Sequence, residues 1–169
     1  MQKKLWLPVL VILVTLVTLI GCGSDDSKKE SSSDTPTENS DAFAILSKKE
    51  EQGIMTIATV YGEFSYPTEF VKGVDVQASE EDGIPTLTFV IHMNDRKESL
   101  FTIRYGGNRG ILFGTYQASK NEKAIGLYVS FAEPPADFSA EDQNTFEMAQ
   151  DLFNDVIASM ANNPGFVLL

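Results

Sequence analysis

The stretch that decides the fold is Thr86–Tyr105, which reads TLTFVIHMNDRKESLFTIRY. Large apolar side chains occupy every second position on both sides of its centre, and Asn94-Asp95 supplies a turn. Such alternation is typical of strands that bury one face, and a short polar turn joins antiparallel neighbours. The stretch therefore predicts two long antiparallel strands, at 86–93 and 99–105.

The same alternation extends in both directions from this hairpin. It predicts five further strands, at 55–60, 63–66, 72–78, 111–117 and 124–131, with turn residues between them. No segment between these strands is long enough to hold a crossover helix, and this disfavours a parallel sheet.

Two helices are expected, one before the strands and one after them. Asp41 as N-cap and Gly53 as terminator predict a short helix over 42–52. A longer helix over 140–161 follows Ser139, and its large apolar residues fall on one face: Phe146, Ala149, Phe153, Val156, Ile157 and Met160. The expected fold is α+β and two-layered, a meandering antiparallel sheet with this long C-terminal helix packed on one face.

Alternation also predicts which residues face away from the long helix. They are Thr88, Val90, His92, Leu100, Thr102, Arg104, Leu112, Tyr116, Tyr128 and Ser130. Because Tyr and Arg are enriched where partners bind, the candidate ligand face consists of Tyr116, Tyr128, Arg104 and His92. The alternative is a covered or simply solvated sheet face, which antiparallel sheets commonly have.

Other motifs carry a weaker chemical signal. Gly106–Gly110 could cradle an anion, but the strand expected after it favours a hairpin loop. Glu80–Gly83 lacks the alternating ligand spacing of a calcium loop, so a turn is the better interpretation. His92 is the single imidazole, and no base and orienting partner can be paired in the sequence. We therefore assign no catalytic, cofactor-binding or metal-binding residue, and a hydrolase that uses a carboxylate pair stays open as an alternative.

Composition excludes several classes of site. The 169 residues include 13 Lys and Arg, 24 Asp and Glu, one Cys and one His, for a formal charge of −11. One Cys and one His cannot build a zinc centre of several such ligands, and one Cys cannot form an internal disulfide. The acidic balance also lacks the basic footprint of a nucleic-acid-binding protein.

The N-terminus has the layout of a signal peptide. Lys3 and Lys4 precede an uncharged run, Leu5–Ile20, that is shorter than the roughly 20 apolar residues of a membrane-spanning helix. The next residues complete the sequence Leu19-Ile20-Gly21-Cys22, which resembles the lipobox of bacterial lipoproteins. The resemblance implies cleavage before Cys22 and a diacylglyceryl group on its thiol. A chance Cys beside an ordinary secretory cleavage site is the alternative.

The expected organisation has three parts: a signal peptide at 1–21, a lipidated Cys and tether at 22–41, and one α+β domain at 42–169. The tether is rich in Ser and acids and lacks the apolar side chains of a core. The domain is similar, in its runs VYGEFSYP (60–67) and LFTI (100–103) and in its C-terminal helix, to small uncharacterised lipoproteins of Gram-positive anaerobes. This resemblance implies no activity and no site residue.

These observations favour a monomeric, non-enzymatic interaction or ligand-binding module, lipid-anchored on the extracytoplasmic face of a bacterial cell membrane. Its expected partners are the membrane, through the lipid, and a protein or small molecule of unknown identity; we expect no cofactor and no nucleic acid. An envelope hydrolase is one alternative. An accessory or immunity lipoprotein that captures cationic peptides is another, because removal of residues 1–21 takes the formal charge from −11 to −13.

Overall fold

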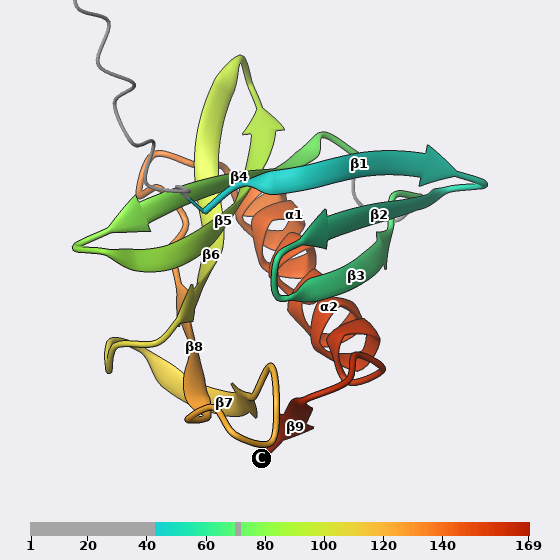
Figure 1. Cartoon of the computed structure of the whole chain (residues 1–169). Helices are drawn as coiled ribbons and strands as arrows, with labels where there is room; N and C mark the ends of the chain where they lie inside the picture. Colours follow the sequence, from blue (N-terminus) through green and yellow to red (C-terminus); the bar gives the residue numbers. More distant parts are fainter. Residues whose placement is uncertain (1–42, 70–71) are drawn as a thin grey trace, which may run out of the picture. The chain divides into compact units, whose positions relative to one another are not determined.

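The structure is a computed structural model that describes residues 43–69 and 72–169, so the predicted signal peptide, Cys22 and the tether lie outside the described residues. The chain forms, in order, β1 (Ile45–Glu51), β2 (Ile54–Thr59), β3 (Gly62–Pro67), β4 (Val74–Glu81), β5 (Ile84–Met93), β6 (Arg96–Tyr105), β7 (Ile111–Tyr116), β8 (Ile125–Phe131), α1 (Ala140–Gln150), α2 (Leu152–Met160) and β9 (Phe166–Leu168) (Figure 1). This is the α+β class predicted from the sequence.

The strands form two antiparallel sheets instead of one meander. One has the order β1-β2-β3, and the other has the order β4-β5-β6-β8-β7-β9. Phe64 of the smaller sheet packs on Phe89 of the larger one, with ring centroids 5.8 Å apart. Lys48 of β1 forms an ion pair with Asp75 of β4 at 2.5 Å. Packing and charge therefore join the two sheets around one apolar core.

The prediction of a helix over 42–52 is wrong, because this segment forms β1. Its residues pair in antiparallel register with β2, from Ile45 opposite Thr59 to Glu51 opposite Ile54. Phe43 is buried, whereas Leu46 is 64% exposed. Spacing of apolar residues over one short segment does not separate a helix from a strand, and here the hairpin partner decides the outcome.

The C-terminal helix is present and begins where the sequence predicts. The Ser139 hydroxyl accepts a hydrogen bond from the Asp142 backbone N–H at 3.1 Å. The helix is divided at Asp151 into α1 and α2. Five of the six predicted core residues on its apolar face are buried, and Ile157 is half-buried. Within the described part of the chain, no helix is both long and apolar enough to cross a membrane.

Two irregularities change which way the strand residues face. In β6 the register shifts by one residue opposite Phe89 and Val90, and Leu100 is the extra residue. In β7 the register shifts between Leu112 and Gly114. Each extra residue reverses the alternation beyond it, so side chains that follow a bulge exchange faces.

Candidate functional site

Tyr116 does not share a face with Arg104 and Tyr128, and the expectation that it does is wrong. Beyond the bulge in β7, Tyr116 stands opposite Ile125, whereas Tyr128 stands opposite both Leu112 and Arg104. Tyr116 is half-buried and packs against the core. The four residues of the predicted ligand face therefore do not form one surface.

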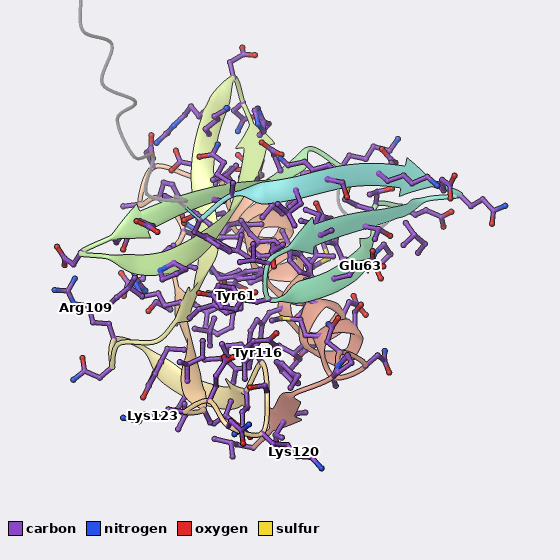
Figure 2. The ribbon with its side chains drawn as sticks, viewed as in Figure 1. Tyr61, Glu63, Arg109, Tyr116, Lys120 and Lys123 are labelled. Carbon is purple, nitrogen blue, oxygen red and sulfur yellow. The ribbon has the colours of Figure 1, made fainter. Side chains whose placement is uncertain are left out.

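The ring of Tyr116 belongs to an aromatic cluster between the two sheets. It meets Tyr61 edge to face at 5.5 Å, and Tyr61 stacks on Tyr105 at 4.4 Å. Phe43 lies 5.6 Å from both Tyr61 and Tyr105. Figure 2 shows Tyr61 and Tyr116 within the body of the fold, whereas Arg109 lies at its margin. The narrow cleft beside this cluster has no room for a water molecule, so we assign it a packing role.

The other predicted surface residues are only partly open to solvent. His92 is exposed, but it is far from Arg104. Thr86 is the residue of β5 opposite Arg104, and His92 lies six residues from Thr86 along that strand, which is about 20 Å by the rise of a strand. Leu100 is fully buried because of the bulge, and Val90 is only 7% exposed. The predicted face is therefore not continuous, and its accessible part is the end that carries Arg104 and Tyr128.

Among the described arginines that form ion pairs, Arg104 has the least exposed side chain. Its side chain is 15% exposed and donates to a Glu81 carboxylate oxygen at 2.9 Å. A second N–H donates to the Ser130 hydroxyl at 3.2 Å. The charge-assisted hydrogen bond to Glu81, the hydrogen bond to Ser130 and the enclosure of the stem hold this side chain in one position.

The turn between β4 and β5 and the loop between β6 and β7 form a cleft of about 180 Å³ beside Arg104. In the turn, Asp82 and Gly83 both have positive φ, as a two-residue turn of this hairpin type requires. The loop spans 106–110 and carries Arg109. The cleft thus brings Glu81 and Asp82 beside the segment 107–109, a proximity that the sequence pattern does not predict.

Glycine is needed in this loop for steric reasons. A Cβ at Gly107 would lie 2.9 Å from Cδ1 of Ile84, and Gly107 has a φ of +74°. A Cβ at Gly110 would collide with the backbone of Val129, and Gly110 also has positive φ. Both positions disfavour any side chain, so the glycines allow the loop to approach the sheet closely. The prediction of a hairpin loop here is wrong, because β6 and β7 do not pair with each other: both pair with β8, and the loop connects strands that lie on either side of it.

Charge in the cleft is balanced. Arg109 lies 3.7 Å from Asp82, and both side chains are more than two thirds exposed. Arg104 and Glu81 form the inner pair and Arg109 and Asp82 the outer one. Ile84 adds an apolar wall. The arrangement can offer hydrogen-bond donors, acceptors and apolar contact to a small ligand.

The described residues contain no group of three His, Cys, Asp or Glu side chains placed to hold a metal ion. The strongest pKa shifts instead belong to tyrosines. Burial, together with the charges of Asp75 and Glu50, raises the pKa of Tyr66 to about 12. Burial also raises the pKa of Tyr105, although a hydrogen bond with Thr59 opposes the shift. Both phenols are therefore neutral packing residues at physiological pH.

No family model, curated protein or solved structure matches the chain.

Proposed function

We propose that this chain is a non-enzymatic binding module of a bacterial envelope, held at the extracytoplasmic face of the cell membrane by lipid on Cys22. The lipobox resemblance supports the anchor, and the cleft at Arg104 is the proposed ligand site. Two or more acyl chains on one Cys bind a bilayer stably, since each buried methylene contributes about 0.8 kcal/mol.

The binding site is inferred from the position of Arg104. Its guanidinium is fixed by Glu81 and Ser130 at a cleft that admits solvent. A preorganised donor loses little conformational freedom when a ligand arrives, so more of its hydrogen-bond energy contributes to affinity. Tyr128, opposite Arg104 on the neighbouring strand, extends the same surface with an aromatic ring.

A capture experiment tests the site. Full-length lipidated protein in vesicles is incubated with the small-molecule fraction of an envelope extract, and the molecules it retains are identified by mass spectrometry. Arg104→Gln should lose a molecule that the unmodified protein retains. Arg96→Gln is the matched control, because Arg96 is also an ion-paired arginine, with Glu98 and Asp137 as its partners, but lies at the opposite end of β6. Equal retention by all three proteins would contradict the assignment.

A second candidate function, capture of a cationic peptide, is favoured by the C-terminal segment. The last 46 residues contain seven acids and no Lys or Arg. Glu147, Asp151 and Asp155 are exposed along α1 and α2. Binding of a Lys-rich peptide that weakens steeply with salt, and that is lost when these three acids become amides, would support capture. Binding unaffected by the three substitutions would reject it.

A further inference from the structure

We propose that the Arg104 cleft binds a small zwitterion, a molecule that carries an ammonium and a carboxylate close together, as a free α-amino acid does. This inference rests on the proposed function and specifies the chemical class of its ligand. It follows from the arrangement of charges, the free hydrogen-bonding capacity of Arg104 and the space between the two loops.

The charges of the cleft come in two opposite pairs. Glu81 and Asp82 lie on the β4–β5 hairpin, whereas Arg104 and Arg109 lie on β6 and the loop after it. A simple anion would have to compete with the carboxylates already present, and a simple cation would be repelled by the guanidinium groups. A zwitterion satisfies both signs without adding net charge to the cleft.

Arg104 retains unused donors for a carboxylate. A guanidinium has five N–H groups, and among the described residues only Glu81 and Ser130 accept hydrogen bonds from this one. A ligand carboxylate can accept from the remaining N–H groups while the pair with Glu81 persists. The ligand ammonium can then donate to the carboxylates of Glu81 and Asp82.

The outer pair can open at little cost. Arg109 and Asp82 are 3.7 Å apart, which is beyond hydrogen-bond distance, and their side chains are 71% and 78% exposed. Exposed ion pairs contribute little to stability, so these two side chains can turn toward a ligand. The cleft has about 180 Å³ of space open to solvent, and Ile84 lines it beside the charges. A small amino acid with an apolar side chain fits this description.

The test uses L-leucine and two matched fragments: isocaproate, which lacks the ammonium, and isoamylamine, which lacks the carboxylate. Equilibrium dialysis against full-length lipidated protein in vesicles should show binding of leucine at millimolar concentration or below, and binding of each fragment weakened about tenfold or more. Arg104→Gln and Glu81→Gln should each weaken leucine binding by a similar factor. Arg96→Gln should leave it unchanged.

The outcomes separate this inference from the proposed function. Isocaproate that binds as well as leucine would overturn the zwitterion and indicate an anion site. Absence of leucine binding, with capture from the extract still dependent on Arg104, would overturn the zwitterion and leave the binding module intact. Leucine binding that is equal in the unmodified protein and Arg104→Gln would overturn the assignment to this cleft. Melting temperatures of the variants, measured in parallel, distinguish lost binding from lost folding.

Discussion

Phe153 joins the C-terminal helix to the larger sheet, and its truncation should be severely destabilising. The side chain is 9% exposed. Its ring meets three others edge to face, those of Phe101 at 5.6 Å, Phe113 at 5.2 Å and Phe131 at 5.3 Å. Phe153→Ala would remove all three contacts and leave a cavity that the surrounding rings can fill only in part.

The expected cost is about 4 kcal/mol, within the range of about 3–5 kcal/mol for a buried Phe changed to Ala. With a urea dependence of about 2 kcal/mol per molar, the unfolding midpoint should fall by about 2 M. Such a loss is a large share of the roughly 5–15 kcal/mol that stabilises a domain of this size. The assay is a urea titration followed by far-ultraviolet circular dichroism.

Asp151→Ala is the control for this experiment. Asp151 lies at the junction of α1 and α2, is exposed, and makes no side-chain capping hydrogen bond. Its replacement should change the free energy of unfolding by about 0.5 kcal/mol or less. Equal midpoints for the two variants would refute the conclusion that the helix packs through this face.

Three further predictions concern the tyrosines and the anchor. Tyr116→Ser should lower the free energy of unfolding by about 2 kcal/mol because the ring packs against Tyr61 and the core. Tyr128→Ser should lower it by less than about 1 kcal/mol. Urea midpoints that rank the other way would contradict the conclusion that Tyr116, and not Tyr128, faces the core. The pKa of Tyr66 is raised to about 12, so above pH 10 the unfolded chain loses a phenolic proton that the folded chain keeps. The free energy of unfolding should therefore fall as pH rises from about 10 to 12, and it should show no such loss below pH 10. Urea midpoints measured across this range, with the ultraviolet absorbance of ionised tyrosine, check the direction; a rise in stability would contradict it. Cys22→Ser should abolish incorporation of a labelled fatty acid and release the product from membranes or leave it as a precursor, and unchanged incorporation would reject the lipid anchor.

The strand segments could be predicted from the sequence, but the direction of their side chains could be predicted only between bulges. All seven segments read from alternation are strands in the structure. Alternation puts Leu100 and Tyr116 on the wrong face because each lies at or beyond an extra residue. Alternation has a period of two, so one inserted residue reverses every later assignment in its strand. Gly114 directly follows the bulge in β7 and is a weak signal of it.

The pairing of distant segments also lay beyond sequence reasoning. The division into two sheets depends on which strands meet, and alternation is the same in either arrangement. β9 was missed because it is three residues long and follows the turn that ends the helix. Arg104 was identified as a candidate by its type and strand position, but its partner Glu81 and the loop with Arg109 are brought beside it only by the fold.

Nuclear magnetic resonance of the arginine side chains tests whether a ligand binds beside Arg104. Full-length protein labelled with ¹⁵N at arginine would be compared before and after addition of the small-molecule fraction of an envelope extract. The Arg104 signal is identified by its absence from the Arg104→Gln variant. We predict that this signal shifts while the signal of Arg96, at the other end of β6, stays in place. An unchanged Arg104 signal, with shifts confined to other arginines, would show that no ligand binds beside Arg104.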